Sequence, residues 1–150
     1  MKTLVVYFSR KGYVRRLAEA LAAKSGADLF ALRTTERTEG VLGFWWCGRF
    51  AMHRSGMPLA AMPRALETYD KVIVCSPVWV FSAAAPIWEF LRRAAGQIRA
   101  VDYVLVHYSP PLHYPKTIAA MDRTLGIIHG SFTSVVCVWG KVLRTKRFSA

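Results

Sequence analysis

The stretch that decides the fold is Lys2-Thr-Leu-Val-Val-Tyr-Phe8, followed directly by Ser9-Arg-Lys-Gly-Tyr-Val14. The first run is short and apolar, as expected for a buried strand, and the second has the serine and glycine of a turn. Apolar residues then recur with helical spacing, at Val14, Leu17, Ala18, Leu21 and Ala22. A strand that leads through such a loop into a helix gathers backbone N–H groups and the positive helix end around one point. The stretch therefore predicts an anion-binding loop at the edge of an α/β sheet.

The rest of the chain alternates strand and helix patterns. Apolar runs predict four more strands, at residues 27–32, 71–75, 102–107 and 132–138. Helical periods run from Pro86 to near Gly96 and from about Pro115 to Leu125. The alternation predicts an α/β fold with a doubly wound, five-stranded parallel sheet, in one domain that spans residues 1–150. Only residues 139–150 follow the fifth strand, so the last helix is expected to be short or absent.

Composition excludes several functional classes. Hydrophobic residues make up 53% of the chain, yet no apolar run reaches the roughly 18–20 residues of a membrane span, and no signal-peptide pattern opens it. Cys47, Cys75 and Cys137 are widely spaced and form no zinc pattern with the four histidines. We therefore expect buried free thiols, no metal site and a cytoplasmic location. Carboxylates are scattered singly and no nucleophile motif appears, so no catalytic residue is predicted.

Charge indicates the kind of partner. Lys and Arg total 21 against 9 Asp and Glu, which gives a net charge of +12 and a pI near 10.2. This balance is compatible with a phosphorylated ligand, nucleic acid, an anionic membrane surface or an acidic protein. The cations are dispersed and do not interleave with aromatic residues as an RNA platform would require. Nucleic acid is therefore not favoured, and an acidic protein stays among the partners that the charge is compatible with.

The segment 41–56 is rich in large apolar side chains and has two interpretations. Its sequence Val41-Leu-Gly-Phe-Trp-Trp-Cys-Gly-Arg-Phe-Ala-Met52 contains two glycines, which favours a short helix followed by irregular chain. Such a cluster packs into a core more often than it forms an interface. The alternative is a lid over a cofactor or an exposed patch for a partner.

Three segments resemble the flavodoxin-like family. Tyr7-Phe-Ser-Arg-Lys-Gly-Tyr-Val14 is similar to the family's phosphate loop, of the form [S/T]-x-T-G-x-T. Tyr69-Asp-Lys-Val-Ile-Val-Cys-Ser-Pro-Val-Trp79, followed by Ala85-Pro86, resembles the strand and loop that lie against the flavin ring. The stretch 43–58 looks like the aromatic, arginine-containing insertion of some small members of the family.

The resemblance implies the strand order 2-1-3-4-5, with FMN at the carboxyl edge of the sheet where the order reverses. It implies that the phosphate loop and the two ring-facing loops supply the cofactor-binding residues, which are Ser9, Arg10, Lys11, Gly12, Tyr13, Val14, Ser76, Pro77, Val78, Trp79 and Tyr108. The chain departs from the family pattern at Lys11 and Val14, where threonines are usual, so the phosphate loop is an altered one. Prolines at 110, 111 and 115 also remove backbone donors from the loop after the fourth strand.

Two functions remain open at this point. The first is an FMN-binding redox protein, either an electron carrier or an FMN-dependent oxidoreductase, with an acidic redox partner. The second is a flavin-free domain of the same fold that binds an acidic protein or an anionic surface. The short or absent last helix also predicts that a second copy of the chain covers the open sheet face in a homodimer.

Overall fold

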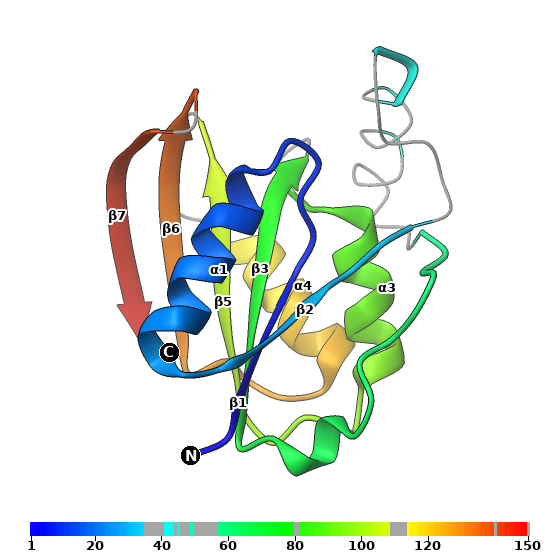
Figure 1. Cartoon of the computed structure of the whole chain (residues 1–150). Coiled ribbons are helices and arrows are strands. Elements are labelled where there is room, and N and C mark those ends of the chain that lie inside the picture. Colours follow the sequence, from blue (N-terminus) through cyan, green and yellow to red (C-terminus); the bar gives the residue numbers. More distant parts are fainter. Residues whose placement is uncertain are drawn as a thin grey trace.

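The chain folds around one twisted sheet with helices on both faces (Figure 1). The computed structural model describes residues 1–34, 41–43, 45, 49, 57–79, 82–108, 114–139 and 141–149. The elements in chain order are β1 (Thr3–Tyr7), α1 (Tyr13–Ser25), β2 (Asp28–Ala31), the 3₁₀ turn η1 (Leu66–Thr68), β3 (Lys71–Trp79), β4 (Ser82–Ala83), α3 (Ala85–Ala94), β5 (Val101–His107), α4 (Pro115–Leu125), β6 (Ser131–Val138) and β7 (Lys141–Ser149).

The sheet has the predicted doubly wound topology. Its neighbouring strands run β2-β1-β3-β5-β6-β7, and the first five of these are parallel. Numbered among the parallel strands alone, the order is 2-1-3-4-5, so the predicted α/β class and strand order are confirmed. Two strands were not predicted: the two-residue β4, which pairs with β3, and β7, which runs antiparallel to β6. The flavodoxin-like layout that the sequence resembles has a last helix after the fifth parallel strand. In this chain residues Lys141–Ser149 form the antiparallel strand β7 at that place.

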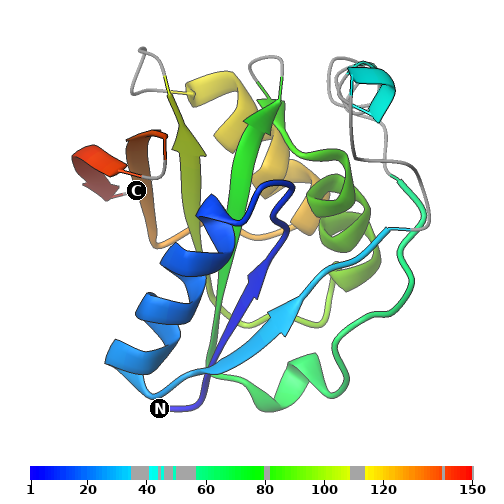
Figure 2. The same cartoon turned by 45° about the horizontal axis from the view of Figure 1, so that its top comes forward.

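Helix α1 covers one face of the sheet (Figures 1 and 2). Its buried residues Val14, Ala18 and Ala22 lie four residues apart, on the stripe that the sequence predicted. Gly12 and Gly26 bound the helix in the left-handed conformation, with φ of 90° and 66°. The sheet residues of this cluster, Val5, Cys75, Val104, Val106, Val135 and Cys137, are all buried. On this face the sheet is therefore covered over β1, β3, β5 and β6, whereas the edge strand β7 is exposed. The homodimer remains an untested prediction.

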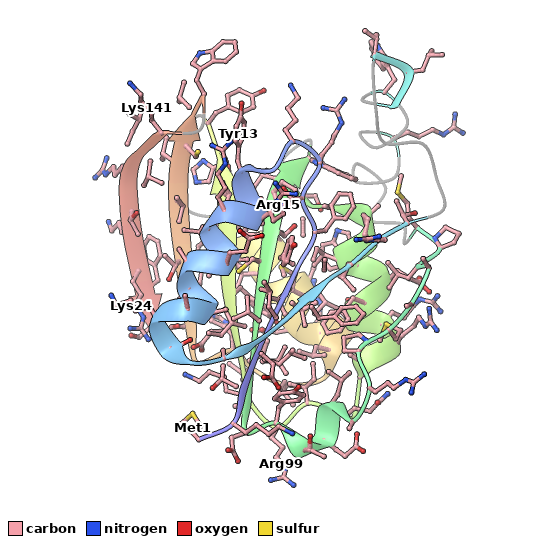
Figure 3. All side chains as sticks on the ribbon, in the orientation of Figure 1. Met1, Tyr13, Arg15, Lys24, Arg99 and Lys141 are labelled. Atoms are coloured by element: carbon pink, nitrogen blue, oxygen red, sulfur yellow. The ribbon has the colours of Figure 1, made fainter. Side chains whose placement is uncertain are left out.

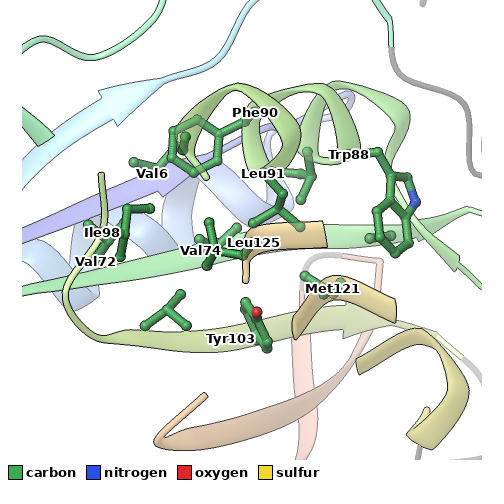
Figure 4. Close-up of a cluster of buried hydrophobic side chains, with 14 of the residues drawn as sticks. Val6, Val72, Val74, Trp88, Phe90, Leu91, Ile98, Tyr103, Met121 and Leu125 are labelled. Atoms are coloured by element: carbon green, nitrogen blue, oxygen red, sulfur yellow. The ribbon is translucent and has the colours of Figure 1, made fainter. Parts of the chain in front are cut away.

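The larger part of the core lies on the other face, under α3 and α4. Figure 4 shows Phe90 and Leu91 of α3, Met121 and Leu125 of α4 and Tyr103 of β5 in one buried cluster, with Phe90 beside Val6 and Met121 beside Tyr103. Each of these side chains is almost fully buried. Because both faces of β3 and β5 are covered, these strands are nearly continuously apolar. Burial of this face fixes the register of the parallel strands, and with it the positions of their carboxyl-end loops.

Strand β7 lies at the sheet edge and is exposed along almost its whole length. Its clearest anchor is Phe148, whose ring stacks on Phe132 of β6 at 5.5 Å between centroids and 14° between planes. Lys141, Arg144, Lys146 and Arg147 make the strand basic. Charged side chains of this kind discourage edge-to-edge pairing between sheets.

The prediction for residues 41–56 falls largely outside the described residues. Of that segment the structure describes residues 41–43, 45 and 49, and here Val41, Leu42 and Trp45 are exposed. These three side chains therefore do not belong to the core. None of the described helices is long and apolar enough to cross a membrane.

Candidate functional site

The carboxyl edge of the sheet holds a cavity of about 470 Å³. The ends of β1, β3, β5 and β6 and the start of α1 all contribute to it. The lining residues are Ser9, Arg10, Lys11, Tyr13, Val14, Pro77, Val78, Trp79, Val106, His107, Tyr108, Cys137, Val138 and Trp139. This volume is within the range of about 300–1,000 Å³ that small-molecule and cofactor sites occupy.

One end of the cavity is formed by the loop between β1 and α1. The Ser9 hydroxyl accepts a hydrogen bond from the Gly12 N–H at 2.9 Å, which closes the loop into a tight turn. Gly12 can lead into the helix because it adopts φ of 90° without steric cost. The first turn of α1 contains no acidic residue, and Arg10 and Lys11 line the cavity beside it. The loop thus combines N–H groups, a positive helix end and two cations, which together favour a bound anion.

The carboxyl end of β3 forms the aromatic side of the cavity. Trp79 is partly exposed, and its ring meets Phe8 edge-on at 5.3 Å between centroids and 89° between planes. An indole held in this way presents a face on which a planar ligand can stack. Pro77 and Val78 line the wall between Trp79 and the sheet.

Ser76 lies outside the lining, although the resemblance implied a role in binding. Its side chain is buried, and its hydroxyl accepts a hydrogen bond from the Ala84 N–H at 2.9 Å and donates one to the Pro77 carbonyl at 2.8 Å. The hydroxyl therefore fastens β3 to the start of α3. Ser82, another serine of this region, accepts a hydrogen bond from the Trp88 indole N–H at 3.0 Å and is buried as well.

The end of β5 supplies the centre of the cavity. His107 is buried and forms a hydrogen bond with the Ser134 hydroxyl of the neighbouring strand, while its ring meets Tyr114 edge-on at 5.2 Å. Tyr108 follows directly and is 74% exposed. A tyrosine that lines the cavity and is this exposed can also stack on a planar ligand.

The far wall comes from the end of β6 and was missed by the sequence analysis. Cys137, Val138 and Trp139 line it, and Trp139 has a positive φ of 51°. The signal was available, because β6 is parallel to β1, β3 and β5 and must end at the same edge. The other predicted residues are brought together as expected: nine of the eleven line the cavity, Gly12 shapes its loop, and Ser76 supports it from below.

The buried thiols predicted from the sequence are present at Cys75 and Cys137, both unbridged, whereas Cys47 lies outside the described residues. Burial raises the pKa of the Cys75 thiol to about 12. The described residues contain no group of three or more His, Cys, Asp or Glu that could hold a metal ion. The cavity is lined by cations, aromatic rings and aliphatic side chains, together with the Cys137 thiol and the His107 imidazole.

Cys75 gives a first testable prediction, on stability at alkaline pH. The unfolded thiol ionises near pH 8.5, whereas the folded thiol stays protonated up to about pH 12. Its stabilising contribution is therefore fully present below about pH 8.5 and is lost as the pH rises toward 12. We expect the gap in unfolding free energy between the wild-type protein and Cys75→Ala to narrow by about 2 kcal/mol from pH 7 to about pH 10. Urea denaturation of both proteins at the two pH values measures this difference in unfolding free energy. An unchanged difference would contradict the raised pKa of the buried Cys75 thiol.

The topology and the position of the cavity are those of a doubly wound α/β protein with a ligand site at the carboxyl edge of its sheet. Doubly wound α/β sheets bind their ligands outside the carboxyl ends of the strands, beside the point where the strand order reverses. Here that point lies between β1 and β3, whose loops form the basic and aromatic ends of the cavity.

Comparison with known proteins identifies the fold as flavodoxin-like. A protein from Bacteroides eggerthii, assigned as a flavoprotein, is 22% identical, with a TM-score of 0.72 over 85% of this chain and 82% of the other. A flavoprotein from Lactobacillus acidophilus, solved in complex with FMN, is 18% identical, with a TM-score of 0.70 over 85% of this chain and 88% of the other. A flavodoxin from the domain Archaea is 16% identical, with a TM-score of 0.53 over 86% and 78%. No protein-family model and no curated protein matches the sequence. The predicted resemblance is thus confirmed at the level of the fold.

Proposed function

We propose that the chain binds FMN in the carboxyl-edge cavity and acts as a flavin redox protein. The observation that carries the proposal is the pairing, in one cavity, of a basic loop at a helix N-terminus with two partly or largely exposed aromatic side chains, Trp79 and Tyr108. Phosphate is the anion that such a loop suits, and a planar ring system is what the aromatic walls suit. The FMN complex of the Lactobacillus acidophilus flavoprotein supports the same choice of ligand.

The residues fit FMN in a way that differs from the family's loop pattern. The hydroxyl donors expected at positions 11 and 14 are replaced by Lys11 and Val14. Backbone N–H groups do not depend on side chains, and the charge of Lys11 and Arg10 compensates for the lost hydroxyls. Trp79 and Tyr108 would hold the ring, while Pro77 and Val78 shape the wall between the ring and the phosphate.

When bound, FMN would supply the electron chemistry. The protein would position the flavin ring and tune its reduction potential. Simple electron transfer requires no acid or base from the protein. Electron transfer in the cytoplasm, with an acidic redox protein as partner, is therefore our proposal for the physiological role. The net charge of +12 supports an acidic partner, because opposite charges steer the encounter of two proteins.

Reconstitution tests this function directly. The protein is mixed with FMN, freed of excess cofactor by gel filtration, and titrated anaerobically with dithionite. The proposal requires one flavin per chain, bleached on reduction and restored by oxygen. A colourless protein would contradict it and would favour the alternative, a flavin-free module that binds an acidic protein or an anionic surface.

The positive charge also makes a prediction about the reduction potential. Reduced flavin carries negative charge, so cations near the cavity favour reduction and make the potential less negative than in acidic flavodoxins. Arg16 lies exposed in the first turn of α1 and is not among the lining residues. We expect Arg16→Glu to lower the potential by about 20 mV, which corresponds to about 0.5 kcal/mol for one electron. Lys24→Glu, at the far end of the same helix, makes the same charge change and should shift the potential much less. Spectroelectrochemistry measures the reduction potential of both variants. Equal shifts in Arg16→Glu and Lys24→Glu would contradict a local effect of the charge at position 16.

A further inference from the structure

Exposed apolar side chains gather at the edge of the sheet that carries the cavity. Trp139 is 89% exposed at the turn between β6 and β7, and Trp45 is 72% exposed. Figures 1 and 2 show that this turn and the segment around Trp45 project from the same end of the molecule, on opposite sides of the sheet. Of the ten large apolar side chains that are exposed in the described residues, six are in these parts of the chain or on the adjoining start of β7, and a seventh, Tyr108, follows β5 at the same edge. The six are Val41, Leu42, Trp45, Trp139, Val142 and Leu143. Exposed apolar side chains that gather in one region usually mark an interaction site.

The described acidic residues avoid this edge. Five of them lie in or beside the amino ends of strands or the last turn of α4, which is the opposite end of the molecule: Asp28, Glu67, Asp70, Asp102 and Asp122. The other two, Glu19 and Glu89, form ion pairs within α1 and α3. The carboxyl edge instead carries cations, at Arg10 and Lys11 beside the cavity and at Lys141 and Arg144 on β7. Figure 3 shows Lys141 and the cavity residue Tyr13 at one end of the molecule and Met1 and Arg99 at the other.

This combination fits direct docking on an anionic lipid surface better than direct docking on an acidic protein. The acidic redox partner proposed above would then be met at that surface. Cations alone would suit either partner, since both are negatively charged. Tryptophan, however, prefers the boundary between headgroups and acyl chains, and aliphatic side chains gain by entering it. The apolar side chains come from separate segments on two sides of the cavity, so they form no single groove for a peptide. A lipid surface accommodates such separate projections without a complementary shape.

We propose that the carboxyl edge docks on the surface of an anionic membrane. Trp139, Val142 and Leu143 would enter the headgroup region, and Lys141 and Arg144 would lie beside lipid phosphates. The cavity then opens toward the membrane, so the redox partner of the proposed flavin is reached at its surface. The proposal itself does not depend on flavin binding, because none of its observations involves the cofactor.

Sedimentation with vesicles tests the docking. The full chain is mixed with vesicles of phosphatidylcholine alone or of phosphatidylcholine with phosphatidylglycerol, at low and high salt. We expect binding to the anionic vesicles only, weakened by salt. The double variant Lys141→Glu/Arg144→Glu should lose binding by at least about tenfold, and Trp139→Ser/Leu143→Ser should lose it while keeping its net charge. Thermal unfolding checks that each variant is folded. We expect both to fold, because the substituted side chains are exposed.

The matched control is Lys24→Glu/Arg99→Glu, which makes the same change in charge away from the carboxyl edge. Figure 3 shows Arg99 at the opposite end of the molecule and Lys24 on its side, in the last turn of α1. This control should bind anionic vesicles within about twofold of the wild-type protein, because these side chains face away from the membrane. An equal loss in both double charge variants would show attraction by net charge alone and would overturn the proposal. The proposal would also be overturned if the wild-type protein binds polyglutamate but does not sediment with anionic vesicles. That result would indicate that this edge docks on an acidic protein.

Discussion

Gly12→Ala is expected to weaken FMN binding by at least about tenfold while lowering stability by only about 1 kcal/mol. Gly12 has φ of 90°, a conformation that side-chain-bearing residues rarely adopt, and the space around an added Cβ is empty. The substitution therefore acts through backbone strain and not through a clash. Relief of that strain rotates the loop N–H groups away from the anion position, on which we expect the cofactor phosphate to depend.

Gly26→Ala is the control for this variant, because Gly26 ends the same helix that Gly12 begins. It has φ of 66°, and an added Cβ there also meets nothing within 4 Å. Both variants should lose similar stability in urea denaturation, but only Gly12→Ala should lose affinity in an FMN fluorescence titration. Normal FMN affinity in Gly12→Ala, or an equal loss of affinity in Gly26→Ala, would show that the loop between β1 and α1 does not bind the FMN phosphate.

Trp79→Ala is expected to weaken FMN binding by about tenfold or more. The indole lines the cavity and is partly exposed, so it is available to a ring that stacks there. Stacking contributes about 0.5–1.5 kcal/mol beyond the apolar area it buries, and the alanine variant loses both contributions. Because Trp79 also packs against Phe8, the variant should be less stable as well. Trp79→Phe keeps an aromatic face and should recover part of the affinity.

Trp88→Phe separates loss of stability from loss of the ligand contact. Trp88 is a buried residue of α3, its indole N–H donates to Ser82, and it is not among the lining residues. The substitution should cost about 1–3 kcal/mol, since the buried Ser82 oxygen loses its donor. FMN affinity should remain that of the wild-type protein. If Trp79→Ala binds FMN as tightly as Trp88→Phe does, the aromatic wall is not a flavin contact.

The parallel core of this fold could be predicted from the sequence because local pattern and tertiary burial agree there. Helix α4 begins and ends at the predicted residues, Pro115 and Leu125, because a proline at its start and a glycine after its end mark the bounds. Strand β7 was missed for the opposite reason. Its residues are exposed on both faces, so no alternation of apolar and polar residues marks it. Pairing with β6 makes it a strand, and that pairing is invisible in a local window.

The site was predictable in its loops but not in the direction of its side chains. The β1–α1 loop and the Trp79 end of β3 line one cavity, because the ends of parallel strands meet at one edge. Whether they bind a cofactor stays a prediction. The sequence cannot tell whether a serine hydroxyl faces a ligand or the backbone, and Ser76 faces the backbone. For segment 41–56 the sequence left two interpretations open, a core cluster or an exposed patch, because apolar clusters are usually buried. The structure shows residues 41, 42 and 45 exposed.

The measurement that tests the central claim most directly is calorimetric titration of the wild-type protein with FMN and, in parallel, with riboflavin. The two ligands share the ring and differ only in the phosphate, so the comparison isolates the basic loop at the start of α1. We predict one FMN per chain, bound at least about tenfold more tightly than riboflavin, with the difference shrinking as salt is added. No saturable binding of FMN, or equal affinity for the two ligands, would contradict a phosphate site in this loop.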